Sequence, residues 1–192
     1  MRGRAAAGGF TLIELMLAIA IAALLIFLGV PSFTTFLRNS EIRSTSESLL
    51  TGLRAASAEA ARQNQRVLFT LAGSNSPSWD FRLVTSPTDC TTTAPDPPIQ
   101  KYAQEEAGQR SKATTTPPAQ RTVCFNGLGR IVNQGVSPSD HIQQIDIDSV
   151  VAGEAHPLRI IVDDSATNPN RRGIRLCDPG LPVLTPPDAR AC

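Results

Sequence analysis

The sequence has few of the residues from which enzyme sites are usually built. Its two histidines, His141 and His156, stand alone, and its four cysteines form no Cys-x-x-Cys pair. No Ser-His-Asp or Cys-His constellation, Walker loop or metal-binding cluster has a recognisable motif. We therefore predict that the protein is not an enzyme and that it holds neither a metal ion nor a cofactor.

The sequence also lacks an excess of one charge and has few aromatic side chains. The 18 basic and 17 acidic side chains give a net charge of +1, and aromatic residues make up 5% of the chain. A near-neutral chain gives no global case for nucleic-acid binding, so any such site has to be local. The 13 glycines and 15 prolines favour short strands and loops over a helical bundle.

What the sequence does contain is a long apolar run near its start. Residues 10–30 carry a single charge, Glu14, and a helix of that length reaches roughly 31 Å, close to the thickness of the hydrocarbon core of a bilayer. The leader, residues 1–9, carries Arg2 and Arg4 but no acid, which holds the N-terminus in the cytoplasm. Because a carboxylate inside a membrane helix costs about 2.5–3.5 kcal/mol, Glu14 is predicted to have a function and a partner.

The junction of leader and apolar run carries a recognisable motif. Gly9-Phe10-Thr11-Leu12-Ile13-Glu14 resembles the type III signal of type IV prepilins and type II secretion pseudopilins. This resemblance implies that prepilin peptidase cleaves after Gly9 and that Phe10 is N-methylated. It also implies that Glu14 pairs with the free amino group of a neighbouring subunit. The alternative is an ordinary signal anchor with a stray acid.

Residues 31–66 are predicted to continue the helix, to about Asn64. Gly29 and Pro31 predict a kink or local melting where the apolar run ends. Pilins that resemble this chain often carry a proline at this point, where the helix loosens as subunits enter the filament. Beyond it the pattern is amphipathic, because apolar residues recur at three- and four-residue steps. These residues are Phe33, Phe36, Leu37, Ile42, Leu49, Leu50, Leu53, Ala56 and Ala60.

Two later segments narrow the resemblance to the GspH/FimT group of minor pilins and pseudopilins. They are the Arg/Ala/Glu-rich helix end with its polar break, residues 53–67, and the strand–Gly–strand segment, residues 125–130. The implied fold is α+β, with the long N-terminal helix packed on a small antiparallel sheet or β-sandwich of about six to eight strands within residues 67–192. No helix pattern follows Gly127-Leu128-Gly129, so we predict a hairpin turn there rather than a phosphate loop.

Short apolar or alternating runs predict the strands. Residues 66–71, 79–84, 122–125, 130–132, 142–151 and 158–162 show this pattern. Trp79 and Phe81 share one face of their strand and are expected in the core. Residues 85–120 are rich in Thr, Pro and Ala, and we predict a long exposed excursion that cannot bury a core, interrupted by a short strand at residues 99–103.

The four cysteines are predicted to be structural. All lie on the C-terminal side of the apolar run, which places them in the oxidising periplasm under the expected topology. Of the three possible pairings we favour the one local in sequence, Cys90–Cys124 and Cys177–Cys192.

A basic segment near the C-terminus is the one local signal for nucleic acid. Arg171, Arg172 and Arg175 fall within five residues, next to Cys177. They resemble the Gly-Arg-x-Arg motif of FimT-like minor pilins that bind DNA. Here the first pair is reversed, as Arg172-Gly173, so only Arg175 maps directly. The other interpretation is a basic hairpin that is solvated or contacts another subunit.

Together these features predict a minor pilin of a type IV pilus, incorporated at or near the filament tip to prime assembly. It would sit in the inner membrane with its C-terminal domain in the periplasm, and then in the filament. Its partners would be other pilin subunits, prepilin peptidase during processing, and DNA if the arginine segment binds it. The alternatives are a GspH-type minor pseudopilin of a type II secretion system and a DNA receptor for natural transformation.

Overall fold

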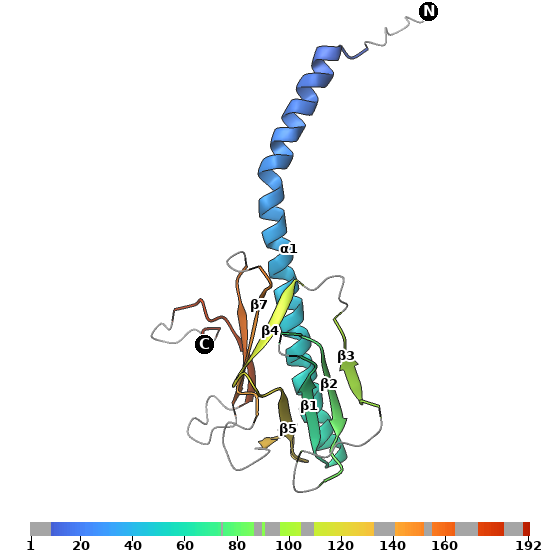
Figure 1. Ribbon diagram of the computed structural model, residues 1–192, viewed down its shortest axis with the longest axis vertical. Coiled ribbons are helices and arrows are strands. Elements are labelled where there is room, and N and C mark those ends of the chain that lie inside the picture. Colours follow the sequence, from blue (N-terminus) through green and yellow to red (C-terminus); the bar gives the residue numbers. More distant parts are fainter. Residues whose placement is uncertain are drawn as a thin grey trace, which may run out of the picture. The chain divides into compact units, whose positions relative to one another are not determined.

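The computed structural model describes one helix, nine strands and parts of the segments between them (Figure 1). The described residues are 9–73, 75–86, 90, 97–104, 110–132, 141–151, 155–163, 173–182 and 190–192, without the side chains of residues 28, 30–32 and 163. The chain divides into two compact units, Met1–Leu37 and Arg38–Cys192. The helix α1 (Leu12–Gln63) begins in the first unit and ends in the second.

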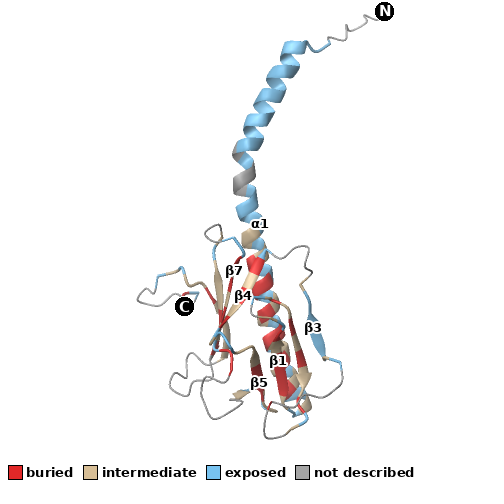
Figure 2. Ribbon diagram, in the orientation of Figure 1, coloured by how far each residue is buried: buried red, intermediate tan, exposed pale blue. Residues whose placement is uncertain are grey.

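In the first unit, α1 exposes its apolar side chains. Leu12 is 77% exposed and Phe27 is 80% exposed, and this part of α1 is pale blue in Figure 2. Among the described residues, no helix is both long enough and apolar enough to cross a membrane. The span over residues 10–30 remains a prediction.

The local melting predicted at Gly29 and Pro31 is not present, because α1 is a single helix from Leu12 to Gln63. A proline inside a helix removes one hydrogen bond, and the turns on either side keep theirs. The apolar run and its amphipathic continuation are therefore one element of secondary structure.

The second unit holds two antiparallel sheets. The first has the order β3-β2-β1-β5-β6 and the second the order β4-β7-β8-β9. The strands of the first are β1 (Val67–Leu71), β2 (Trp79–Leu83), β3 (Gln100–Tyr102), β5 (Thr122–Phe125) and β6 (Ile131–Val132). Those of the second are β4 (Ser111–Thr116), β7 (Gln144–Ser149), β8 (Leu158–Asp163) and β9 (Gly173–Cys177). This confirms the predicted α+β class, with one strand more than the expected range.

The core lies between one face of α1 and the inner faces of the sheets. The predicted apolar stripe is confirmed over this unit, since Leu49, Leu53 and Ala56 are fully buried and their side of α1 is red in Figure 2. Trp79 and Phe81 are in the same core, as predicted. The Trp79 ring lies so close to the helix that a Cβ on Gly52 would be 2.7 Å from it. The absence of a side chain at Gly52 is therefore what lets β2 approach α1.

The prediction of an exposed excursion over residues 85–120 is wrong at its C-terminal part. Residues 111–116 form β4, which pairs with β7 over its whole length. Ser111, Ala113 and Thr115 alternate inward and are buried, and the Ser111 hydroxyl is hydrogen-bonded to that of Thr45 on α1 at 3.1 Å. Small and β-branched residues with period two are enough to line this part of the core, although their composition is that of a loop.

Two disulfides fasten the second unit, in the pairing favoured from the sequence. Cys90–Cys124 ties the segment after β2 to β5, and both cysteines are buried. Cys177–Cys192 ties the C-terminus to the end of β9. There the Asp178 amide donates a hydrogen bond of 2.7 Å to the Arg190 carbonyl, so the last residues lie beside the strand end.

Candidate functional site

The start of α1 is held by a residue that the sequence reasoning passed over. The Glu14 backbone amide donates to the Thr11 hydroxyl at 3.3 Å, and Thr11 immediately precedes the first helical residue. Thr11 is thus the N-cap, and Glu14 stands at the third helical position, as in a capping box. The Thr-x-x-Glu spacing before an apolar run was the signal that could have identified Thr11. An acid in the first turn also interacts favourably with the positive end of the helix dipole.

Glu14 has no charged neighbour within its own part of the helix. It is the only ionisable side chain in residues 9–37, and the next one along the helix is Arg38. Among the described residues 9–37, no other ionisable side chain is present to pair with its carboxylate. Gly9 precedes the helix, and a Cβ built on it would meet no atom within 4 Å. Among the described residues, nothing requires glycine there. The side chain of Pro31, the other predicted assembly residue, lies outside the described residues.

The arginine segment is only partly described. Arg171 and Arg172 lie outside the described residues, and Arg175 is a half-buried residue of β9 opposite Ile161 of β8. Its Nε is buried without a hydrogen-bond partner in the described part of the chain. Because neighbouring Ile174 packs against the core, strand alternation turns Arg175 to the other face of the sheet. DNA binding through this segment stays a prediction.

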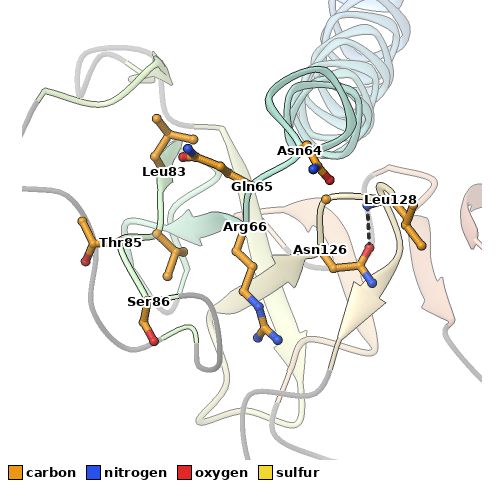
Figure 3. A pocket seen from close by; sticks show the side chains of 10 residues that line it. Asn64, Gln65, Arg66, Leu83, Thr85, Ser86, Asn126 and Leu128 are labelled. Atoms are coloured by element: carbon orange, nitrogen blue, oxygen red, sulfur yellow. Dashed lines mark hydrogen bonds between the residues drawn. The ribbon is translucent and has the colours of Figure 1, made fainter.

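A cleft of about 760 Å³ lies at the C-terminal end of α1 (Figure 3). We call it the end cleft. It is lined by Asn64, Gln65, Arg66, Leu83, Val84, Thr85, Ser86, Asn126, Gly127 and Leu128. The helix stops here because Asn64 adopts a left-handed conformation, with φ of 50°, and the Gln65 amide closes the last turn on the Ala60 carbonyl at 3.2 Å. The Arg66 guanidinium contacts the sulfur of Cys90 at 3.6 Å.

The turn between β5 and β6 borders the end cleft and is rigidly built, as predicted for a hairpin turn. Asn126 Oδ1 accepts hydrogen bonds of 3.0 Å from the amides of Leu128 and Arg130, the first of which is drawn in Figure 3. Ser57 of α1 donates to the Gly129 carbonyl at 2.7 Å. A Cβ on Gly127 would lie 2.9 Å from the Asn64 backbone, so the turn packs directly on the helix end.

A second cleft, of about 710 Å³, lies on the other side of this turn. We call it the side cleft. It is lined by Arg54, Ser57, Ala58 and Ala61 of α1, by Phe125 and residues 128–131 around the turn, and by Gly173 and Ile174 of β9. The sequence reasoning missed it because its walls meet only in the folded domain. The one available signal was the run of small residues on the helix face beside the apolar stripe.

The described residues hold no metal centre. Among them, no group of three or more His, Cys, Asp or Glu side chains is placed to hold an ion.

Two family models match this chain. The model of the type II transport protein GspH matches residues 45–175, well over half of the chain. The chain belongs to the GspH family. The prokaryotic N-terminal methylation motif matches residues 4–30 of this GspH-family protein. It is accordingly a structural protein of the minor pilin or pseudopilin kind, and the motif implies processing by prepilin peptidase and assembly with other pilins.

Solved structures show the same fold as this GspH-family chain. The type IV minor pilin FimU of Pseudomonas aeruginosa PAO1 has a TM-score of 0.50 at 15% identity, over 73% of this chain and 91% of FimU. A second crystal form of FimU gives 0.47 at 14% identity, over 70% and 90%. None of the curated proteins matches the chain. At this identity the likeness to FimU establishes the fold alone.

Proposed function

We propose that this GspH-family protein is a minor pilin that joins a type IV pilus at or near its tip and helps to prime assembly. The observation that carries the proposal is the helix start. A methylation motif leads directly into a helix whose residues 12–27 are exposed and apolar, with Glu14 as the only charge. An exposed apolar surface of that extent requires a membrane or a protein partner.

The geometry suggests how such a subunit would change surroundings. Before assembly, residues 10–30 would lie in the inner membrane and the domain in the periplasm. Cleavage after Gly9 would leave the amine of Phe10 beside the helix start, and Glu14 would pair with the amine of a neighbouring subunit. Such a pair is strong in an apolar medium. Because membrane and filament core are both apolar, the helix would pass between them without exposure to water.

Changing Glu14 to alanine is expected to leave cleavage intact and to lower the amount of protein in sheared filaments at least tenfold. The physical reason is that the amine of the neighbouring subunit would be left unpaired in an apolar core. Immunoblots of membrane and filament fractions measure both steps.

Thr11→Ala is the control for this experiment. It removes the hydroxyl that accepts the cap hydrogen bond from the backbone amide of Glu14, worth about 1 kcal/mol, but leaves the carboxylate in place. We expect a much smaller loss than for Glu14→Ala. Wild-type incorporation of Glu14→Ala, or equal losses in the two variants, would count against the pairing.

A second candidate is a minor pseudopilin of a type II secretion system, which the description of the matching family favours. The two disulfides of the domain and its arginine-rich segment are the reasons that we favour a type IV pilus. Deleting the gene distinguishes the two. We expect loss of surface pili with normal protein secretion, whereas retention of exported enzymes in the periplasm with normal pili would support the pseudopilin.

A further inference from the structure

We propose that the side cleft binds an extended acidic segment of a neighbouring subunit. The proposal rests on the proposed function to the extent that the neighbour is another subunit of the same filament. Three independent features of the described residues lead to it, namely the charge of the cleft, its apolar floor and the two sheet edges beside it.

Among the described residues, the side chains that line the cleft carry positive charge without a compensating acid. Arg54 and Arg130 line it, and none of the described residues that line it carries a carboxylate. Neither guanidinium makes a hydrogen bond or ion pair with any residue that the structure describes. Glu59, an acid in the C-terminal part of α1, is engaged by Arg62 and Gln63, which hold its pKa at about 2. Two arginines that are free to form charge-assisted hydrogen bonds favour a carboxylate ligand.

Part of the floor and rim of the cleft is apolar. Ala58 and Ala61 leave room where larger side chains would fill it, and Ile131 and Ile174 are half-buried beside them. Leu128 is 75% exposed at the apex of the turn, and the hydrogen bonds to Asn126 and Ser57 fix that turn on α1. A large apolar side chain held on a rigid support loses little entropy when a partner covers it.

The cleft also lies at the ends of both sheets. Among the described strands, β6 is the last of the first sheet and β9 the last of the second. Gly173 and Ile174 at the start of β9 line the cleft, and the described part of the C-terminal tail pairs beyond the other end of that strand, at Asp178. A strand edge that no described strand covers offers main-chain hydrogen bonds to an added extended segment. The edge therefore favours an extended peptide over a helix.

These features favour a peptide over duplex DNA. DNA binds through many phosphate contacts on a broad basic surface, whereas here the two arginines flank a concave, apolar floor. Arg175, the one described member of the predicted DNA motif, is on the face of β9 opposite to Ile174 and the cleft.

The test uses the full-length protein in neutral detergent micelles and fluorescence anisotropy. The probe is a fluorescein-labelled octapeptide that alternates Asp or Glu with Val or Leu. We expect it to bind at least tenfold more tightly than its amide analogue, in which Asn and Gln replace the acids. Arg54→Gln and Arg130→Gln are each expected to weaken binding about fivefold or more. Arg43→Gln, which removes an exposed arginine from the same helix, is expected to change it less than about twofold.

Equal binding of the acidic peptide and its amide analogue would overturn the proposal, as would equal losses in Arg54→Gln and Arg43→Gln. Duplex DNA that displaces the peptide and loses affinity in the same two cleft variants would identify a nucleic-acid site instead. The same preparations are checked for cleavage after Gly9 and for entry into filaments. If both occur while peptide binding fails, this inference falls and the proposed function stands; a chain that is never cleaved argues against the proposed function itself.

Discussion

Replacing Gly9 with valine is expected to leave the whole leader on the chain. Gly9 lies before the first turn of α1, and a Cβ there would touch no atom within 4 Å. The fold therefore tolerates a larger residue, and any effect of the change has to arise in the peptidase that recognises the leader. A branched side chain beside the scissile bond restricts the backbone that the enzyme must bind. The uncleaved chain is recognised by its slower migration and higher mass.

Ala7→Val serves as the control, because it adds comparable bulk inside the same leader without changing the residue at the predicted cleavage point. We expect this variant to be cleaved normally and to reach filaments. Normal processing of Gly9→Val would show that the motif at the start of the chain is not read as a prepilin signal.

Gly52→Val is expected to destabilise the domain by about 3 kcal/mol, at the upper end of ordinary overpacking. The added Cβ would lie 2.7 Å from the Trp79 ring. That ring cannot move aside easily, since it stacks on Phe69 and Phe81 at centroid distances of 5.7 and 6.2 Å. Its Nε1 also donates to Ser48 of α1 at 3.3 Å. The gain in helix propensity over glycine, below about 1 kcal/mol, does not offset the clash.

Thermal unfolding followed by the fluorescence of Trp79, the only tryptophan, measures this effect. A loss of about 3 kcal/mol corresponds to a fall in Tm of roughly 6–12 °C for a domain of this size. Gly29→Val is the matched control, because a Cβ at that helical glycine meets nothing within 4 Å. An unchanged Tm for Gly52→Val would contradict the close packing of β2 on α1.

Much of the fold was predictable because its apolar residues recur with a strong periodicity. Leu49, Leu53 and Ala56 are spaced so that a helix places them on one side, and the sheet that covers them follows in sequence. Trp79 and Phe81 alternate with polar residues, so their strand and its inward face were readable. The Cys90–Cys124 pair closes a stretch that already lay between two predicted strands.

The strand β4 was not predictable in the same way. Of its inward residues only Ala113 is apolar, and Thr115 owes its burial to pairing with Ile145 of β7. A threonine in a strand and a threonine in a linker look alike in sequence, because strand preference depends on what the neighbouring strand supplies. Tertiary context decided this element.

The candidate sites also differ in how far the sequence predicts them. The motif around Gly9 and Glu14 is local, so its residues could be found in order along the chain, and Thr11 was available from its spacing to Glu14. The side cleft brings Arg54 and Arg130 together from positions far apart in sequence. The turn between them is fixed by the packing of Gly127 on Asn64 and by the hydrogen bond from Ser57 to the Gly129 carbonyl. No sequence pattern predicts that Arg54 and Arg130 lie close together.

The N-terminal residue of the mature protein tests the central claim most directly. Protein is recovered from the membrane and from sheared filaments, digested, and its N-terminal peptide is identified by mass spectrometry. If this GspH-family chain is a filament subunit released by prepilin peptidase, the peptide begins at Phe10 and carries one methyl group on its amine. A chain that begins at Met1, or at any residue other than Phe10, would contradict the account.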